Sequence, residues 1–514
     1  MALAEWLPAV FCGLLPVVWL PTAVDLFILP RVALVVGFGV LLPVAALAVG
    51  GPGWASLRPL RWPLLAVAGA AALAAAFSVN PWLSLAGAYT RYESLVVRLA
   101  YLGIFAGTAA LGWRPRARTR VLRLFVAGCC VAGAEAVFQA AGHQLDRPDG
   151  NLGQPGLLGG LLAMAIPAAV QLGLQAWPWL LTAIPLGAGL YLSVSRAGWL
   201  GAVAGSVLAL AVFSPARWRR ATAGLAVAAV AVAVLVLLLS PLRHLNQDTG
   251  TARLGVWSDS LRMVAARPLT GWGEEATGLV FGRFQTADWE PGNTFDRIHD
   301  QPLDLLVAQG LAGGLAAVWL WSLFWLRVGG ACWRGTRGVS GAAGACLAYA
   351  AWSVLNFDWA PATGAFYALA GLAWAAAQGP AAEGPAARPG RGQGRWLLAA
   401  AAVGVALALA VPPLFADVAY RSGRSTQAVT LDPLQARYHQ ALGEQLGPNS
   451  PRGLAELRRA RDLGDYDYSF LIELGDAERT AGHLAEARRA YQAAKDSYPF
   501  DPTAPQRLRD LGRA

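Results

Sequence analysis

Residues 296–321 read DRIHDQPLDLLVAQGLAGGLAAVWLW, a charged tetrapeptide followed by a long and almost unbroken apolar run. Because a membrane-spanning helix needs about 20 mainly apolar residues, this stretch predicts a span that begins just after His299. The chain has 5 histidines in all, and this one is flanked by Asp296, Arg297 and Asp300. Charges at helix ends commonly cap and anchor the helix. A chemical role for His299 therefore depends on the rest of the sequence.

Apolar runs of this kind recur along the whole chain. Of its 514 residues 56% are hydrophobic and 14% charged, whereas soluble domains carry about 25% charged residues. We therefore predict an all-α fold, a polytopic transmembrane helical bundle of about 12–13 spans, whose first apolar run is a span and not a cleaved signal peptide. The candidate spans are residues 8–28, 31–50, 60–78, 94–112, 121–141, 155–173, 177–194, 197–214, 221–240, 302–326, 340–356, 363–378 and 396–415.

The basic residues orient this bundle. A net charge of +10 would suit a nucleic-acid partner, but the arginines cluster in joints between even- and odd-numbered spans. By the positive-inside rule that side is cytoplasmic, so the N-terminus is inside, whereas the loop 241–301 and everything after residue 416 are outside. We therefore expect no nucleic-acid partner. The joints contain Arg58 and Arg61, residues 114–120, residues 217–220, Arg327 with Arg334 and Arg337, and Arg388 with Arg391 and Arg395.

Motifs for cofactors and metals are missing from the sequence. The 5 cysteines fall in or beside apolar segments, and their odd number and placement predict neither a disulfide framework nor a metal site. We find no HExxH, no phosphate-binding GK[ST] loop and no glycine-rich dinucleotide fingerprint. We expect no cofactor and no metal.

After Ala416 the composition becomes charged and helical, which predicts two domains, 1–416 in the membrane and 417–514 outside it. The stretch 474–499 fits the tetratricopeptide pattern, although Glu478 stands where an aromatic residue is expected. Two such repeats bury too little surface to be stable alone, so we expect 417–514 to pack on the membrane part or on a protein partner. DYD at 465–467 resembles the metal-binding pair of nucleotide-sugar enzymes, but its place at a repeat boundary favours a structural role.

Several arginines lie on the predicted outer side, against the positive-inside trend. Arg91 precedes the span at 94–112, Arg196 occupies a joint of a few residues, and Arg253 opens the large loop. A single outward arginine could simply reach the lipid headgroups. A planar guanidinium also donates two parallel hydrogen bonds to phosphate, so the set predicts a binding site for a lipid diphosphate at headgroup depth.

The beginning of the large loop predicts a helix lying along the membrane surface. Apolar residues recur there at helical spacing between positions 249 and 268, and Pro268 ends the pattern. The stripe consists of Leu254, Trp257, Leu261 and Val264.

His299 has a structural and a chemical interpretation. A lone histidine at a helix start is often only a hydrogen-bonding group. Imidazole also titrates near neutral pH and can take a proton from a hydroxyl group, and Asp296 or Asp300 could fix its orientation. The sequence therefore offers general-base chemistry combined with arginines that stabilise a leaving phosphate.

The chain resembles the O-antigen ligase and polymerase superfamily over about residues 60–378. Taken singly the motifs are short, but their order and the large outer loop that ends at a histidine-headed span are typical of the family. The motifs are GAYTRYESLV (87–96), NLGQPGLLGG (151–160), SVSRAGWLG (193–201), ARLGVWSDSLRMVAARPLTGWGEE (252–275) and DRIHDQPLDLLVAQGLAGG (296–314).

This resemblance implies a membrane glycosyltransferase of the bacterial cytoplasmic membrane. The donor would be a glycan on undecaprenyl diphosphate, and an acceptor hydroxyl would displace the diphosphate with inversion and without a metal. By position His299 matches the catalytic histidine, Arg196 and Arg253 match the arginines assigned to the diphosphate, and Arg91 matches less closely. Asp300 departs from the asparagine that many members have; an acid there could raise the pKa of His299 or only cap the helix.

The acceptor remains open. Ligases move a glycan to lipid A core, polymerases join repeat units, and other members glycosylate proteins; an outer repeat domain favours a ligase or a protein transferase. A transporter or flippase would need charges deep inside spans, for which Arg98 and Glu135 are the candidates. A non-catalytic scaffold that presents the repeat domain would leave His299 dispensable.

Overall fold

The computed structural model describes residues 3–50, 52–218, 251–379 and 393–513, with three isolated positions between 219 and 250. The described residues form helices and connecting loops, without a β-strand. Seven of their helices are long and apolar enough to cross a membrane, so the predicted polytopic all-α class is confirmed. The membrane part contains α1 (Leu7–Leu14), α2 (Ile28–Ala48), α3 (Arg61–Ala76), α4 (Pro81–Ala86), α5 (Leu95–Leu111), α6 (Pro115–Ala141), α7 (Pro155–Gln175), α8 (Ala183–Leu192), α9 (Arg196–Phe213), α11 (Thr251–Ala266), α12 (Thr277–Val280), α13 (Gln301–Trp333), α14 (Ser340–Ser353), α15 (Ala360–Ala377) and α16 (Gln393–Arg421).

Each predicted span other than 221–240 overlaps a helix. The span predicted at 221–240 lies outside the described residues, apart from three isolated positions. The first span is shorter than predicted, because α1 ends at Leu14 and not at residue 28. Pro16 and Pro21 follow within a few residues, and proline cannot donate the backbone hydrogen bond that would continue a helix. The chain turns instead, and the Leu20 N–H donates to the Leu26 carbonyl at 2.9 Å.

Small residues let the helices of the bundle approach closely. Gly201 and Gly205 of α9 face Ala348 and Gly344 of α14, and a Cβ atom on Gly201 would stand 2.5 Å from the carbonyl oxygen of Ala348. Such small-residue stripes are a common basis of helix packing in membranes. This contact holds the N-terminal half of α9, the helix that begins at Arg196, against α14.

The helix α13 is broken at Gly310, whose φ of 62° and ψ of −161° are not helical. The neighbouring segment satisfies the freed backbone groups: Leu311 N–H donates to Pro268 O at 2.7 Å and Trp272 N–H donates to Val307 O at 2.9 Å. Backbone away from regular helix is tolerated at membrane depth only when it is satisfied in this way. The break therefore fixes residues 268–273 against α13.

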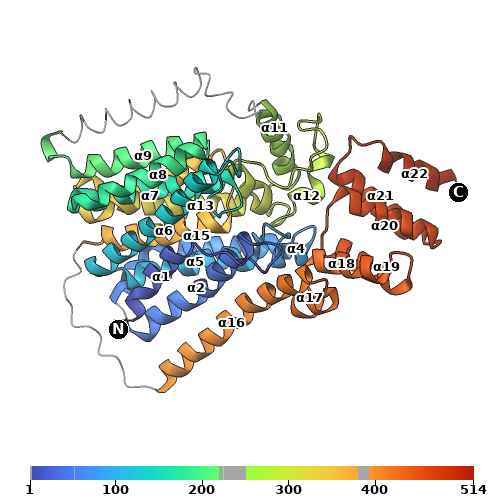
Figure 1. Ribbon diagram of the computed structural model, residues 1–514, viewed down its shortest axis with the longest axis horizontal. Helices are drawn as coiled ribbons and strands as arrows, with labels where there is room; N and C mark the ends of the chain where they lie inside the picture. Colours follow the sequence, from blue (N-terminus) through green and yellow to red (C-terminus); the bar gives the residue numbers. More distant parts are fainter. Residues whose placement is uncertain are drawn as a thin grey trace.

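The predicted inner and outer loops lie at opposite ends of the bundle, with α4, α11 and α12 at one end next to the C-terminal helices (Figure 1). The arginine-rich joints lie at the other end. There Arg114 pairs with Glu5 at 2.7 Å, and the Arg337 guanidinium lies 5.5 Å from the centre of the Phe213 ring. The segregation of the loops agrees with the predicted alternation of spans. Which end faces the cytoplasm stays a prediction.

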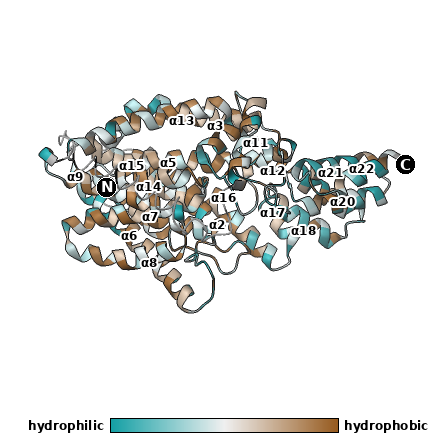
Figure 2. Ribbon diagram, turned by 90° about the horizontal axis from the view of Figure 1, so that it is seen from above, coloured by the Kyte–Doolittle hydropathy of each residue, from teal (hydrophilic) through white to brown (hydrophobic). Residues whose placement is uncertain are grey.

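The C-terminal part is a more hydrophilic array of helices beyond the apolar bundle (Figure 2). Helix α16 runs past residue 416 to Arg421, and α18 packs on α19 and α20 on α21. In the second pair Gly475 lies directly on the ring of Tyr491, which is fully buried. The tetratricopeptide assignment remains a prediction. The helices are α17 (Ser425–Leu431), α18 (Ala436–Leu446), α19 (Pro451–Asp462), α20 (Tyr468–Thr480), α21 (Leu484–Ser497) and α22 (Thr503–Arg513).

The two unusual features of this array have structural roles. Glu478, which replaces the expected aromatic residue, is buried and accepts from Arg458 Nη2 at 2.7 Å. In the DYD segment Asp467 caps α20 by accepting from Phe470 N–H at 2.8 Å, and Asp465 accepts from Asp467 N–H at 3.1 Å. Both carboxylates of the segment thus serve the turn before α20.

Candidate active site

Residues 354–359, between α14 and α15, form a loop at the end of the bundle that is predicted to face outward. The helix α15 starts at Ala360 with Pro361 in its first turn, and proline is well suited to that position. The loop contacts the amphipathic helix α11, because Arg253 Nη1 donates to the carbonyl oxygen of Leu355 at 3.1 Å.

His299 and Arg91 meet the same loop from two other parts of the chain. The His299 ring stands edge-on to Phe357 with 5.0 Å between ring centres, and Arg91 lies 4.5 Å from the centre of the Trp359 ring. His299 has a φ of 58°, an uncommon conformation for a residue other than glycine and one that clusters at functional sites. Three of the predicted site residues therefore converge on one loop.

Asp296 is held by Arg91. The guanidinium donates from Nε to Oδ2 at 2.7 Å and from Nη2 to Oδ1 at 3.3 Å, a two-pronged contact between both oxygens and one arginine. Burial alone would raise the pKa of Asp296, but the charge of Arg91 and its hydrogen bonds keep that pKa below the ordinary value. Asp296 is therefore a carboxylate fixed close to His299 in the chain.

Asp300 caps α13. Its Oδ1 atom accepts from Leu303 N–H at 2.8 Å, so this oxygen performs the capping function that the sequence left as one of two alternatives. Burial raises the pKa of Asp300, and the hydrogen bond from Leu303 counteracts part of that shift. The cap fixes the direction in which α13 leaves the His299 turn.

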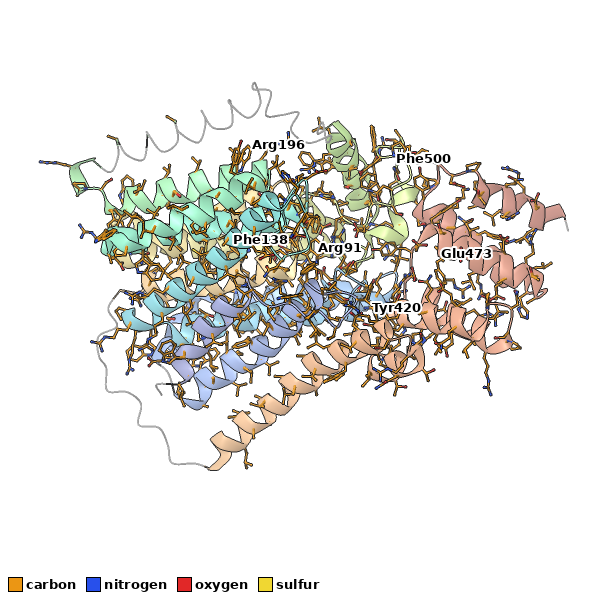
Figure 3. The ribbon with its side chains drawn as sticks, viewed as in Figure 1. Arg91, Phe138, Arg196, Tyr420, Glu473 and Phe500 are labelled. Atoms are coloured by element: carbon orange, nitrogen blue, oxygen red, sulfur yellow. The ribbon has the colours of Figure 1, made fainter. Side chains whose placement is uncertain are left out.

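Arg196 is the first residue of α9 and lies near the outer end of the bundle, like Arg91 (Figure 3). The preceding Ser195 caps α9 through a 3.2 Å bond from Gly198 N–H. Arg147, which the sequence reading passed over, lies close enough for the charge of Arg196 to add to the effect of burial in lowering the pKa of Arg147. Arg147 also donates from Nη2 to the carbonyl oxygen of Ser193 at 3.1 Å, which holds it against the joint that precedes α9.

A buried network of charges underlies the His299 turn. Arg297, only 2% exposed, donates to Asp304 Oδ2 at 3.0 Å and pairs with Glu275. Asp304 also accepts from Ile298 N–H at 3.3 Å, and Glu275 accepts from the backbone N–H of Glu93 at 3.0 Å. The network therefore ties the His299 turn to the segment that carries Arg91. Its members come from two motifs that the sequence shows, GEE at 273–275 and the Arg of DRIH, whose pairing depends on the fold.

Arg98 belongs to the same end of the protein. It lies in the first turn of α5, pairs with Asp358 and lies 3.4 Å from Glu274, while Gln309 Nε2 donates to Glu274 Oε1 at 2.5 Å. Arg98 therefore does not mark a charge deep within a span, and it lends no support to a transport pathway.

A cavity of about 400 Å³ lies beside this polar cluster. Its walls are mostly apolar side chains of α3, α5 and α13, and its polar end contains Arg98, Gln301 and Asp358. Leu315 and Val318, which also line it, are 67% and 63% exposed. The cavity therefore extends from the polar loop towards the apolar lateral surface of the bundle.

Helix α11 forms where the sequence predicted a helix, and its placement along the membrane surface stays a prediction. Leu254 and Leu261 of the predicted stripe are 63% and 60% exposed, whereas Val256 and Met263 are buried. Trp257 Nε1 donates to the Ile298 carbonyl at 3.1 Å, one residue before His299. The two leucines are exposed, whereas Trp257 of the same predicted stripe contacts the turn that carries His299.

Comparison with known families adds one finding. Residues 181–318 match the family model described as O-antigen ligase. This segment is therefore similar to O-antigen ligases. It includes Arg196, Arg253 and His299, whereas Arg91 and the C-terminal helices lie outside it. A search of curated proteins found no match.

The match confirms the predicted superfamily and supports a glycan-transfer function in a membrane. Within the described ranges, no group of three or more His, Cys, Asp or Glu side chains has the arrangement of a metal site.

Proposed function

We propose that the protein transfers a glycan from undecaprenyl diphosphate to an acceptor hydroxyl group at the outer face of the bacterial cytoplasmic membrane. The convergence of Arg253, His299 and Arg91 on residues 354–359, within or beside an O-antigen ligase domain, is the observation that supports it most. A site of this kind needs a proton acceptor and cations at headgroup height, and both are gathered there.

In the proposed reaction the oxygen of the acceptor hydroxyl attacks the anomeric carbon of the donor sugar. The bond from that carbon to the diphosphate oxygen breaks, and undecaprenyl diphosphate leaves with the bonding electrons. His299 takes the proton of the acceptor hydroxyl. Arg253 and Arg196 bind the diphosphate and stabilise the charge that grows on it in the transition state.

Arg91, Asp296 and Asp300 support this chemistry. Arg91 uses Nε and Nη2 to hold Asp296, which leaves Nη1 to face a phosphate oxygen. Asp296 provides a negative charge close to His299, whose charge is one of the influences that lower the pKa of Asp296. Asp300 orients His299 indirectly, through the start of α13.

The apolar cavity supports a lipid-linked donor. Its walls of leucine and valine suit an isoprenoid chain, whereas its polar end lies next to Asp358 in the loop that His299 contacts. Pockets for small ligands are mostly apolar with a few polar groups that fix orientation, and this cavity has that composition. The lipid would thereby present its diphosphate at the loop.

Separate measurements of donor affinity and single-turnover rate test the division of labour. Arg253→Ala should weaken donor binding and slow transfer, since the diphosphate charge grows during the reaction. Arg253→Lys should restore only part of both, because an ammonium group lacks the planar fork. Arg262→Ala, on the same helix and 56% exposed, serves as the matched control. Donor binding unchanged in Arg253→Ala would refute the assignment of Arg253.

A further inference from the structure

Asp417 is a fully buried carboxylate near the end of α16, the apolar helix that leads into the C-terminal array (Figure 1). Its Oδ2 atom accepts from the backbone N–H groups of Val24 and Asp25 at 2.6 and 2.9 Å. Its Oδ1 atom accepts from the hydroxyl groups of Tyr89 at 2.6 Å and Tyr438 at 3.0 Å. A carboxylate can accept about four hydrogen bonds, so both oxygens are fully used and Asp417 is a fixed point of the structure.

The tyrosine rings around Asp417 also pack on one another. The Tyr89 ring stands edge-on to the rings of Tyr420 and Tyr438, with 6.2 and 5.9 Å between ring centres. Tyr420 belongs to α16 and lies where the bundle meets the C-terminal helices (Figure 3), and Tyr438 belongs to α18. The Tyr89 side chain is therefore held by ring packing as well as by its hydrogen bond. Removal of the hydroxyl group alone leaves the packing in place.

Tyr89 belongs to a turn between α4 and α5 whose backbone is unusual. Thr90 and Tyr92 have φ values of 71° and 58°, which residues other than glycine adopt rarely and keep only where the surrounding contacts enforce them. A Cβ atom on Gly87 would stand 2.6 Å from the Cα atom of Tyr92, so the turn is also closed tightly on itself. Its conformation therefore depends on contacts with the rest of the protein.

These contacts reach the turn from two sides. On one side Trp359 Nε1 donates to the carbonyl oxygen of Thr90 at 3.2 Å, and the buried charge network holds the end of the turn at the N–H of Glu93. On the other side the Tyr89 hydroxyl donates to Asp417. Loss of the Asp417 contact would leave the turn anchored from one side.

Arg91 lies in the middle of this turn. Its guanidinium holds Asp296 and stands 4.5 and 5.0 Å from the centres of the Trp359 and Phe357 rings. Arg91 is two residues from Tyr89, so the backbone that the Tyr89 hydrogen bond fixes is the backbone that directs Arg91. A shift of the turn would move the guanidinium relative to the loop 354–359.

We propose that Tyr89 and Asp417 are positioning residues for the donor: they fix the turn that directs Arg91 at the diphosphate, without touching the donor themselves. This inference rests on the proposed function, in which Arg91 faces a phosphate oxygen. When the turn is free to move, a smaller fraction of the protein has Arg91 in place, and the apparent Kd rises in proportion. Donor affinity thereby depends on how the end of α16 is joined to the bundle.

The test measures the Kd of an undecaprenyl diphosphate-linked oligosaccharide for the purified full-length protein without acceptor. Tyr89→Phe should raise this Kd about twofold to tenfold, the range for the loss of one hydrogen bond, and by less than Arg91→Ala. Tyr438→Phe is the matched control, because it removes the other hydroxyl group from the same oxygen of Asp417; its Kd should stay near that of wild type. Asp417→Ala is not used, since it leaves four donors unpaired at once.

A double-mutant cycle shows whether the effect passes through Arg91. In the Arg91→Ala background Tyr89→Phe should not raise the Kd further, because the side chain that it positions is already gone. Effects of the two substitutions that simply multiply would overturn the inference, because Tyr89 would then act on the donor by another route.

Three other results would also overturn it. They are an unchanged Kd in Tyr89→Phe, an equal rise in Tyr438→Phe, and a normal Kd in Arg91→Ala. Because donor binding is measured without turnover, each of these results is distinct from failure of the proposed glycan transfer, which is tested at His299.

Discussion

Replacing Arg297 by Gln should destabilise the protein strongly. Arg297 is 2% exposed and is shared by two buried carboxylates, Asp304 at 3.0 Å and Glu275. The substitution leaves both carboxylates without their cation. Breaking a buried pair by removing one partner costs on the order of 3–5 kcal/mol, which we expect here.

The matched control is Arg283→Gln at the surface. Arg283 pairs with Asp496 at 2.8 Å but is 50% exposed, and exposed pairs contribute only about 0–1 kcal/mol. Both substitutions remove one guanidinium and keep a polar side chain of similar length. The difference in stability between the two variants therefore measures the effect of burying the ion pair.

The assay is the midpoint of thermal unfolding of the purified proteins in one detergent at one heating rate. Arg297→Gln should lower the midpoint by several degrees, since about 1 kcal/mol shifts it by roughly 2–4 °C in a chain of 150–250 residues and by less in a larger one. Arg283→Gln should remain close to wild type. Equal midpoints for the two variants would refute the account of the network.

The loss of stability in Arg297→Gln should also depend on pH. Burial raises the pKa of Glu275 to about 8 even with Arg297 beside it, and loss of the guanidinium removes an influence that lowers this pKa. A carboxyl whose folded pKa is raised contributes stability at low pH that is lost as the pH rises through that value. The difference in thermal midpoint between Arg297→Gln and wild type should therefore increase from pH 6 to pH 9. A gap that narrows over this range would contradict the sign of the shift.

Three further predictions concern topology, metals and the helix break. Single cysteines at Ser258 and Ser469, both exposed, should react with an impermeant maleimide on intact cells in a background without the native thiols; protection until lysis would reverse the orientation. Transfer should survive excess EDTA, because arginine can supply the positive charge; loss that Mg²⁺ or Mn²⁺ restores would contradict this. Gly310→Ala should lower the thermal midpoint and activity, because its Cβ atom would stand 2.5 Å from the Leu269 backbone, whereas Gly329→Ala, with open space around it, should do neither; equal effects would show that the break needs no glycine.

The sequence predicted the helical class, the positions of the long apolar helices and a helix where α11 lies, because each depends on local hydrophobic pattern and length. It also identified Arg253 and His299 as candidate site residues, and in the structure both contact the loop 354–359. The predicted first span was too long, because the apolar composition of residues 8–28 conceals the effect of Pro16 and Pro21, which follow the end of α1.

The buried network could not be read from the sequence. Glu275 and Arg297 are separated by 22 positions, and their pairing depends on how the large loop folds back onto α13. DYD drew attention through its two carboxylates, whereas the structure uses both for the turn before α20.

Single-turnover transfer by purified His299→Ala protein tests the central claim most directly. Wild type and variant are loaded with an undecaprenyl diphosphate-linked oligosaccharide and mixed with lipid A core in detergent, after donor binding and thermal midpoint have been compared. The account predicts near-normal donor binding and a rate lower by on the order of 10²–10⁴, the contribution of a general base. Near-normal turnover in His299→Ala would contradict it and leave His299 as a structural residue at the start of α13.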